Sequence, residues 1–565
     1  MAADPHGRAH SQLAVALCAF AYLYAFPYQA NLNNPNENVR VYMTAALVED
    51  GTYAIDGPRK RWGWVNDAAR KDGHTYSVKA PGTSLLGVPG YALYLGACGL
   101  LDRPFDRIEV LWVLRLTASI LPSLLALYLF HRWLSRQGHP PALRDAAFFS
   151  VALGSNLYAY GMLFVSHTAS AIAAFAAFAL LHDARGLPGP CRSWRAFAAG
   201  FAAAAVTLFE YPGLPCSVVL TLFALGVLWP RGGLRSIAAF AVGGLLPTLA
   251  VMHFQWSAFG NPLTPGHLFV ESRKFRQAHH EGFYGAVAPN MESLHGLLTD
   301  PGAGLFPLTP LLVFGLPGLA LLCAKRGRRA EGLCATAICL LTVLAIASMN
   351  NWRGGWTVGP RYLALTIPFL AWAALVALDR VARVSEAVSV ALALGATAVG
   401  MLASGLPSVY YPHLMPAVTR PLPQVLSVLI AHDFAPMNAG NLFGVYGTRS
   451  MIPLLLAALA ALALCLSSVR ARRMRLLLSV GAAVVALCMA VPVLKRPEGY
   501  DPDARGALAF ITRRWFPEGH DRAARLRAEL KRQTTVSDAD RRRLARVYAQ
   551  EGRKREARRA LRGNP

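Results

Sequence analysis

Long apolar segments alternate with short polar segments along most of this 565-residue chain. A helix needs roughly 20 apolar residues to cross the hydrocarbon of a bilayer. Runs of that kind predict membrane-spanning helices near residues 12–30, 110–131, 146–163, 166–183, 196–211, 213–229, 236–256, 303–323, 333–349, 362–379, 386–404, 451–468 and 476–494. The pattern therefore predicts an all-α polytopic membrane protein with about 13 spans.

The composition agrees with this prediction, because 54% of the residues are hydrophobic and only 15% are charged. Soluble domains carry roughly 25% charged residues. No small-residue cleavage site follows the first apolar run, so we expect an uncleaved span rather than a signal peptide. The nine cysteines lie mostly in apolar runs without a Cys-x-x-Cys pair, which favours neither a metal ribbon nor a disulfide framework.

The formal net charge of +25 would by itself suggest nucleic-acid binding. The basic residues, however, gather in short clusters between apolar runs, as the positive-inside rule expects of cytoplasmic loops. The clusters are Arg132, Arg136 and Arg144; Arg185, Arg192 and Arg195; Arg231 and Arg235; Lys325, Arg326, Arg328 and Arg329; Arg380 and Arg383; and Arg470, Arg472, Arg473 and Arg475. We therefore expect a multi-pass membrane protein with these loops in the cytoplasm, an arrangement compatible with a bacterial inner membrane, with membrane lipids and no nucleic acid as partners.

One further apolar stretch, residues 84–101, does not fit this arrangement. As a full span it would move every later basic cluster to the opposite face of the membrane. Gly87, Pro89 and Gly90 also interrupt it. We therefore expect a re-entrant or surface-lying helix there. Residues 1–494 then form a transmembrane domain with three long outer loops, at residues 31–109, 257–302 and 405–450.

The C-terminal tail, residues 495–565, is rich in arginine. Its segment from Arg541 to Arg562 resembles one helical hairpin of the tetratricopeptide type. A single unit of this type cannot bury its own face, so a basic cap on anionic headgroups is the alternative. The number of spans places the tail outside, whereas its charge favours the cytoplasm.

The first outer loop is far longer than the 4–6 residues of a typical connector. Residues 37–49 have a helical pattern, with Asn36 as the expected N-cap. Glu37 in the first turn could simply favour the helix dipole; Asp67 could be another helix-start acid, and Lys79 a surface lysine in a turn. Together, however, they suit a group transfer, in which a carboxylate takes a proton from a hydroxyl and cations hold a phosphate.

The motifs of this region occur in a fixed order: one span, an acidic-x-x-Arg segment, ALVEDGTYAID, an Asp before Gly-x-x-Tyr, and Lys-x-Pro before a short apolar stretch. This order resembles the GT-C superfamily of integral-membrane glycosyltransferases. It is most similar to the bacterial branch with the aminoarabinose transferase of lipid A and the protein mannosyltransferases. The resemblance is best over residues 12–130 and weaker in FGNPLTPGH, DPGAGLFPLTP and NNWRGGWTVGPRYL. We assign Tyr76, from the Gly-x-x-Tyr segment, to substrate binding.

The resemblance implies transfer of a sugar from a polyprenyl-phosphate donor to a glycolipid, glycan or protein acceptor on the extracytoplasmic face. The catalytic acid then matches Glu37 and a second carboxylate matches Asp67, while Lys79 and Arg40 match residues that meet the donor phosphate. Many relatives have Asp-Glu where this chain has Asn36 before Glu37, so the identity of the acting carboxylate stays open. No cofactor is assigned, and since relatives differ in their need for a divalent metal, that requirement stays open too.

Further candidates lie at the outer ends of predicted spans. Arg361 could clamp a phosphate beside Trp352 and Trp356 as a sugar platform, or it could snorkel in an interfacial aromatic belt. Glu210 lies between two short spans and is either a substrate-binding acid or an acid in a wet turn. His167, near another outer turn, is interpreted as structural.

Two other classes of function remain beside a transferase. A transporter or flippase of lipid-linked saccharide would show internal repeats and charged or broken helices around a midplane cavity. A non-catalytic scaffold would depend on the helical tail. The sequence has no visible repeat and few ionisable residues deep in the spans, which favours the transferase. The basic run from Arg273 to His280 is either a solvated face or a lid that recruits an anionic acceptor.

Overall fold

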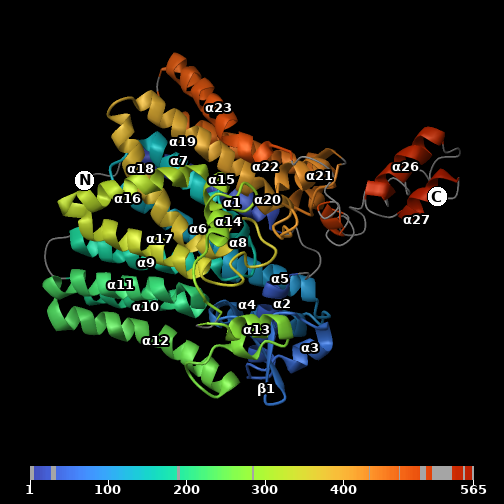
Figure 1. Cartoon of the computed structure of the whole chain (residues 1–565), viewed down its shortest axis with the longest axis horizontal. Coiled ribbons are helices and arrows are strands. Elements are labelled where there is room, and N and C mark those ends of the chain that lie inside the picture. The colour runs from blue at the N-terminus through green and yellow to red at the C-terminus, as the bar shows by residue number, and fades with distance from the viewer. Residues whose placement is uncertain are drawn as a thin grey trace.

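The computed structural model describes residues 5–26, 34–186, 191–282, 285–431, 433–469, 471–496, 504, 506–508, 510–511, 537–550 and 554–562. Over these residues, the only sheet is a two-stranded antiparallel hairpin, and nearly all other regular structure is helical. The predicted all-α fold is therefore confirmed. Helices α9 to α12 and α16 to α18 run side by side in Figure 1, while α2 to α5 and α13 gather at the end away from the N-terminus.

The regular elements follow the apolar pattern along the chain. The N-terminal part contains α1 (Pro5–Ala25), α2 (Pro35–Glu49), α3 (Asp56–Trp62), β1 (Ala68–Lys71), β2 (His74–Ser77), α4 (Gly82–Leu100), α5 (Arg107–Arg115), α6 (Leu121–Ser135), α7 (Pro141–Ala152), α8 (Leu157–Met162) and α9 (His167–Gly186). The middle part contains α10 (Ser193–Phe209), α11 (Leu214–Leu228), α12 (Gly233–Phe259), η4 (Gly266–Phe269), α13 (Arg273–His280), α14 (Met291–Leu298), α15 (Leu305–Leu308), α16 (Gly315–Ala324) and α17 (Arg329–Ala347). The C-terminal part contains η7 (Arg361–Thr366), α18 (Ile367–Ala382), α19 (Glu386–Gly400), α20 (Leu406–Tyr410), η9 (Leu422–Leu426), α21 (Ser427–Ala431), α22 (Ile452–Leu466), α23 (Arg472–Leu494), α26 (Asp538–Gln550) and α27 (Lys554–Leu561).

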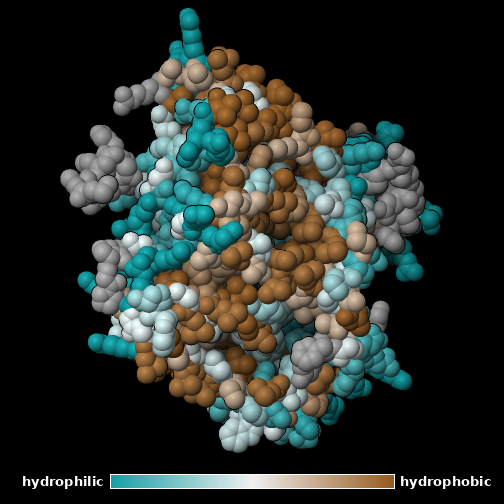
Figure 2. All heavy atoms as spheres, turned by 60° about the vertical axis from the view of Figure 1, so that its left-hand side comes forward, coloured by the Kyte–Doolittle hydropathy of each residue, from teal (hydrophilic) through white to brown (hydrophobic). Residues whose placement is uncertain are grey.

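Nine helical segments of the described chain are long and apolar enough to cross a membrane. Apart from Gly82–Leu100, each coincides with a predicted span. Three predicted spans form the shorter apolar helices His10–Ala25, Ser193–Phe209 and Pro310–Ala324. The other two are α9 and a span that breaks after α7 and resumes as α8. Figure 2 shows hydrophobic side chains across the middle of one face, with hydrophilic side chains toward both sides of the view.

One end of the helical bundle carries the predicted cytoplasmic clusters. Arg136 pairs with Asp183 near the end of α9 at 2.9 Å, and Arg185 pairs with Glu331 on α17. These contacts bring loops from different parts of the chain together. We call this the basic end, defined by the described residues of 132–144, 183–195, 229–235, 325–331 and 380–385.

The opposite end carries the predicted outer loops. Ala69 of the first loop forms a β-bridge with Val270 of the second, and Asn34 of the first contacts His413 of the third, with Nδ2 3.2 Å from Nδ1. We call this the loop end, defined by the described residues of 31–109, 257–302 and 405–450. The grouping of loops at two ends agrees with the prediction from the basic clusters.

Helix α4 occupies the stretch predicted to be re-entrant or surface-lying. Its length and composition would allow it to cross a membrane, yet both of its ends contact residues near the loop end. At its start, a Cβ on Gly82 would lie 2.7 Å from the backbone oxygen of Leu208, near the end of α10. Toward its end, the Tyr94 hydroxyl donates to Glu109 in the first turn of α5, at 2.9 Å. The helix therefore starts and finishes on the same side of the bundle.

The first-loop helix begins earlier than predicted. Helix α2 starts at Pro35, and the side chain of Asn34 caps it by accepting the Asn36 backbone N–H at 2.9 Å. The prediction of Asn36 as the N-cap is wrong. Proline is favoured in the first helical position, because its fixed φ suits a helix and its missing N–H would have no helical partner.

The segment after Asp67 is a β-hairpin rather than the helix considered for it. Strands β1 and β2 pair Ala68 with Ser77 in antiparallel register. Asp72 and Gly73 form the turn, with φ values of 50° and 85°. Asp-Gly is a strong sequence signal for such two-residue turns, because both positions need a positive φ. This signal was present in the sequence and points to a hairpin.

The described parts of the tail pack in two different ways: its start packs against the rest of the chain, and its last two helices pack against each other. Ala507 and Ile511 are buried against the main hydrophobic core, and the Phe510 ring meets the Trp356 ring edge-on at 5.3 Å. The start of the tail therefore contacts the same loop as Trp356. Helices α26 and α27 pack together through a small cluster of their own that includes Leu544, Tyr548 and Ala560. Residues 512–536 of the predicted tail lie outside the described residues.

Helices α10 and α12 approach closely enough that only glycine fits between them. A Cβ on Gly200 would lie 1.9 Å from the Phe240 oxygen, and one on Gly243 would lie 2.0 Å from the Phe197 oxygen. We expect Gly200→Ala to push the helices apart and lower the stability by about 1–3 kcal/mol. Thermal unfolding in detergent measures this loss. Gly226→Ala on α11 is the control, because nothing lies within 4 Å of that added Cβ, and equal stability of the two variants would contradict the prediction.

Candidate functional site

The β-hairpin of the first loop brings Asp67 and Lys79 together. Asp67 precedes β1 and Lys79 follows β2, so closing the hairpin places their backbones side by side. The Lys79 ammonium lies 3.0 Å from Asp67 Oδ2, and the two side chains remain 15% and 27% exposed, respectively. Burial alone would raise the pKa of Asp67, but the positive charges of Lys79, Arg361 and Arg40 hold it below its ordinary value. The pair is thus an accessible ion pair with two further cations nearby.

Helix α2 adds Arg40 to this pair. Its guanidinium is almost fully buried and donates from NH2 to Ser166 Oγ at 2.6 Å and from NH1 to the Asn36 backbone oxygen at 3.0 Å. The same NH2 lies 3.6 Å from Glu210 Oε1. These contacts fix the planar guanidinium, which is suited to hold a phosphate or carboxylate group.

Glu210 lies in the turn that follows α10 and joins three side chains. Its Oε1 accepts the Ser166 hydroxyl and lies 3.3 Å from His167 Nδ1, besides its contact with Arg40. Its side chain is 15% exposed. The proline at 212 follows in a new short turn, which separates Glu210 from the helix and leaves its carboxylate at the loop end.

A glycine-rich loop leads to Arg361. Gly354 has a φ of 73°, and a Cβ there would lie 2.7 Å from Arg361 Nε. The guanidinium stacks on Tyr362 at 4.9 Å from the ring centre and donates to its hydroxyl at 3.1 Å. Gly354 therefore provides both the turn and the space that the arginine needs.

Several buried polar atoms around these residues have no hydrogen-bond partner among the described residues. They include Arg40 Nε, His167 Nε2, Arg361 Nε and both amide atoms of Asn156. Such groups are rare in native structures, and leaving one unsatisfied costs about 1–3 kcal/mol. Their presence around Asp67 and Lys79 is typical of a site that binds a polar ligand.

The structure places Glu37 apart from this set. It is fully buried, and Arg115 donates to both of its oxygens, at 2.9 Å from Nε and 2.7 Å from NH2. The Phe164 backbone N–H donates to Oε1 at 2.8 Å. Burial alone would raise the pKa of Glu37, but Arg115 lowers it below its ordinary value. Both of its oxygens thus have buried donors, and the ion pair with Arg115 joins α2 to α5.

The aromatic candidates are distributed over the loop end. The Trp352 ring fills the space over Gly296, where a Cβ would lie 2.1 Å from the ring. Trp356 is 44% exposed and has the Phe510 contact described above. Tyr76 on β2 packs edge-on against Phe259 at 5.7 Å between ring centres. Of these three, Trp356 presents the most surface to a ligand.

The basic run of the second outer loop forms α13, which lies beside the site through His267. The His267 and His279 ring centres are 5.0 Å apart. Burial, followed by the charges of Lys79 and His279, lowers the pKa of His267 to about 3. Arg273 and Arg276 remain exposed. Helix α13 thus has a basic outer face and an inner edge near Lys79.

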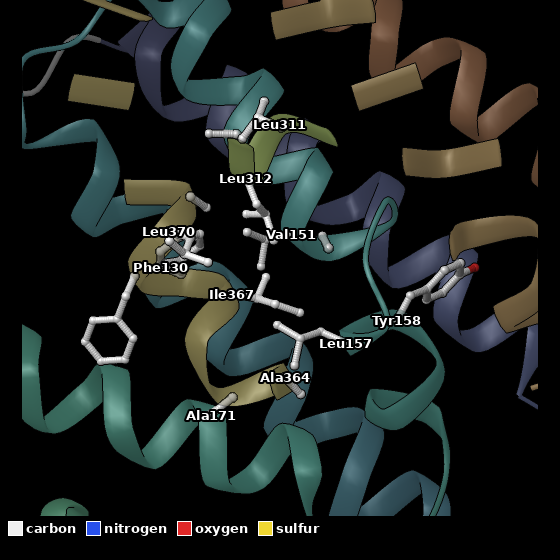
Figure 3. Packing of buried hydrophobic residues seen from close by; sticks show 14 of the residues in the cluster. Phe130, Val151, Leu157, Tyr158, Ala171, Leu311, Leu312, Ala364, Ile367 and Leu370 are labelled. Carbon is white, nitrogen blue, oxygen red and sulfur yellow. The ribbon is translucent and has the colours of Figure 1, made fainter. Parts of the chain in front are cut away.

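An apolar cleft of about 430 Å³ lies between α6 and α9. Its wall on α9 extends from Thr168, next to His167, to Asp183 at the basic end. That distance along the helix is roughly 22 Å. Phe130, Leu157 and Ala171 belong to the wall and are seen in Figure 3. The cleft thus runs along α9 between mainly apolar side chains, and Arg132, Arg136 and Asp183 line it at the basic end.

The cluster that these segments build contains three cations, Arg40, Lys79 and Arg361, and two carboxylates, Asp67 and Glu210. The balance of charge suits an anionic ligand, with carboxylates left to accept a proton. Among the described residues, no group of three or more His, Cys, Asp or Glu could hold a metal ion.

Of the sequence candidates, Arg40, Asp67, Lys79, Glu210 and Arg361 come together. Glu37 is paired with Arg115, and the Trp352 ring lies against Gly296. Sequence reasoning missed Ser166 as part of the site and Arg115 as the partner of Glu37. It also interpreted His167 as structural. The available signal was the polar pair Ser166–His167 directly before an apolar helix, because polar residues at such a helix start commonly mark a functional end.

No protein-family model and no curated protein sequence matches this chain. Among solved structures, the chain is similar to one described as the crystal structure of ArnT from Cupriavidus metallidurans bound to undecaprenyl phosphate. The match has 16% sequence identity and a TM-score of 0.42, and it covers 90% of this chain and 80% of that chain.

Proposed function

We propose that this chain is a membrane glycosyltransferase that moves a sugar from a polyprenyl-phosphate donor to a glycolipid, glycan or protein acceptor. The observation that carries the proposal is the convergence of Arg40, Lys79 and Arg361 with two carboxylates. An apolar cleft whose lining on α9 begins at Thr168, one residue after His167, accompanies this cluster. A phosphate headgroup suits the cations, and a long apolar chain suits the cleft. The motif order of the first loop, which resembles the GT-C superfamily, leads to the same class of reaction.

In this proposal Lys79, Arg40 and Arg361 bind the donor phosphate. The acceptor hydroxyl attacks the anomeric carbon, and the bond from that carbon to the phosphate oxygen breaks. The developing negative charge on the leaving phosphate is stabilised by the same cations. Binding the leaving group in a partly buried site makes each charge interaction stronger than it would be in water.

The polyprenyl chain is proposed to lie in the cleft between α6 and α9. The cleft begins near Thr168, next to His167, and is lined mainly by alanine, leucine and phenylalanine side chains. A wholly water-exposed site would leave such a chain as a large apolar surface. The cleft therefore accounts for a lipid donor better than for a soluble nucleotide sugar.

The proton of the acceptor hydroxyl needs a base. Asp67 and Glu210 have oxygens within the cluster, whereas both oxygens of Glu37 are held by Arg115 and Phe164. As the base that takes this proton, the proposal therefore favours Asp67, or a group at Glu210, over Glu37. Trp356 and Tyr76 stay proposed contacts for the sugar, since stacking on aromatic faces suits the apolar side of a sugar ring.

We propose that the reaction takes place on the extracytoplasmic face of a bacterial inner membrane. The arginine-rich loops of the basic end favour the cytoplasmic side. The cation and carboxylate cluster lies with the opposite loops. The donor headgroup would therefore be presented outside the cell, next to envelope acceptors.

Native mass spectrometry of the purified chain with undecaprenyl phosphate tests the donor site. We expect Lys79→Ala to weaken binding about tenfold, because one charge-assisted contact to phosphate contributes about 1.5 kcal/mol or more. Lys325→Ala is the matched control, since Lys325 is an exposed lysine at the basic end. Equal binding by the two variants would remove Lys79 from the donor site. Absence of binding by the unaltered chain would contradict the proposed function.

A further inference from the structure

His167 and Glu210 form a histidine–carboxylate pair at the edge of the cation cluster. Glu210 Oε1 lies 3.3 Å from His167 Nδ1. A carboxylate this close to Nδ1 favours the tautomer that carries its proton on Nδ1, which leaves the lone pair on Nε2. Nε2, on the other side of the ring from Glu210, is therefore the nitrogen that can accept a proton.

The ring of His167 is held firmly. It is 3% exposed, and it meets the rings of Tyr160 and Tyr362 edge-on, at 4.9 and 5.7 Å between centres. Its Nε2 is buried and has no hydrogen-bond partner among the residues that the structure describes. A nitrogen that is both oriented and unpartnered beside a ligand site is the geometry expected of a general base.

From this geometry we infer that His167 is the general base of the proposed transfer and that Glu210 is its positioning residue. The inference rests on the proposed function. In the step, the acceptor O–H gives its proton to His167 Nε2 while its oxygen forms a bond to the anomeric carbon. The bond between that carbon and the phosphate oxygen breaks, and the phosphate leaves with the electron pair. Glu210 stabilises the imidazolium, which then returns its proton to water.

Asp67 is less suited to this task. Its carboxylate is held by the Lys79 ammonium at 3.0 Å. Protonating it would break this ion pair, whereas Nε2 of His167 has no hydrogen-bond partner to lose among the described residues. Asp67 instead serves to hold Lys79 in place for the donor phosphate.

The charged and titratable groups that face His167 come from several elements. Glu210 approaches from the turn after α10, Arg40 from α2, Lys79 from the end of the hairpin, and Arg361 and Tyr362 from η7, with Tyr160 on α8. The three cations make it less favourable for the His167 ring to carry a positive charge. Glu210 is the anion of this set that contacts the ring directly, so the acid–base behaviour of the site depends on it.

The test is a transfer assay in lipid nanodiscs. Lipid-linked sugars extracted from the producing cells serve as donor, and the envelope fraction of the same cells serves as acceptor. Release of polyprenyl phosphate is followed by mass spectrometry from about pH 5 to about pH 9. Binding of undecaprenyl phosphate is measured on the same samples. His167→Asn is the main variant, because its amide can still donate to Glu210 but cannot accept a proton.

We expect His167→Asn to bind undecaprenyl phosphate like the unaltered chain and to lose about a hundredfold in rate. We also expect it to lose the fall in rate toward acid pH that an imidazole base causes. Glu210→Gln should move that fall to lower pH, because removing the carboxylate makes the ring harder to protonate. His182→Asn is the matched control, since His182 pairs with Asp183 on the same helix at the basic end, and it should keep the rate.

Each result separates the inference from the proposed function. If the unaltered chain transfers sugar and His167→Asn keeps its rate and pH profile, the base assignment is wrong while the transferase stands. If His167→Asn binds no lipid, the histidine has a structural role and the inference is overturned. If the unaltered chain neither binds the lipid nor releases it from the donor, both proposals fall together.

Discussion

Glu37→Ala should destabilise the protein by about 3–5 kcal/mol, because it leaves the Arg115 guanidinium buried without its carboxylate. Both side chains of this ion pair are essentially inaccessible to water. Arg115→Ala should cost a similar amount, because it leaves Glu37 as the uncompensated charge. Thermal unfolding in detergent, followed by circular dichroism, measures both losses.

The double variant Glu37→Leu with Arg115→Met distinguishes a supporting role from a catalytic one. Replacing a buried ion pair by apolar residues of similar volume is often neutral. The double variant should therefore recover most of the stability, less a cost of about 1–3 kcal/mol for the Phe164 N–H that loses its acceptor. It should also transfer sugar. A stable double variant without transfer would return Glu37 to the catalytic residues.

Ala176→Phe should weaken binding of undecaprenyl phosphate about a hundredfold. Ala176 lines the cleft between α6 and α9 and is only half-buried, so a larger side chain can extend into the cleft without overpacking the core. Each CH₂ group excluded from an apolar site costs about 0.8 kcal/mol, and about four of them account for the expected effect. Native mass spectrometry gives the ratio of the affinities.

Two controls make this experiment specific. Geranyl phosphate is too short to reach Ala176, which lies about 12 Å along α9 from Thr168, so both proteins should bind it alike. Ala460→Phe adds the same bulk to an exposed position on α22 and should leave both affinities unchanged. Undiminished binding of undecaprenyl phosphate by Ala176→Phe would show that the chain of the lipid lies elsewhere.

The helical segments and their grouping were accessible from the sequence, because both depend on local properties. A run of apolar residues in lipid must satisfy its backbone hydrogen bonds internally, so it becomes a helix. Short basic loops mark one side of the membrane irrespective of what they contact. The same reasoning identified residues 84–101 as a helix that returns to its starting side, although its composition alone resembles a span.

The structure differs from the prediction at the start of α2 and in the segment after Asp67. In both places the backbone conformation depends on proline, aspartate or glycine. Pro35 moved the start of α2 by two residues, so that Asn34 rather than Asn36 caps it. Asp72 and Gly73 turned the chain back as a hairpin. Both signals are present in the sequence and both act through φ, which proline restricts and which glycine and aspartate tolerate at positive values.

The amino-acid pattern was thus sufficient to predict a helical membrane protein, and it places Arg40, Asp67 and Lys79 in one long segment between predicted spans. The difference between the candidate carboxylates became visible in the folded chain. Glu37 meets Arg115, which is distant in sequence, whereas Glu210 meets Arg40 and His167. The free-energy difference between the ionised and the protonated form of a carboxylate depends on its burial and on the charges around it. Those surroundings are assembled from segments far apart in the chain, and no local pattern specifies them.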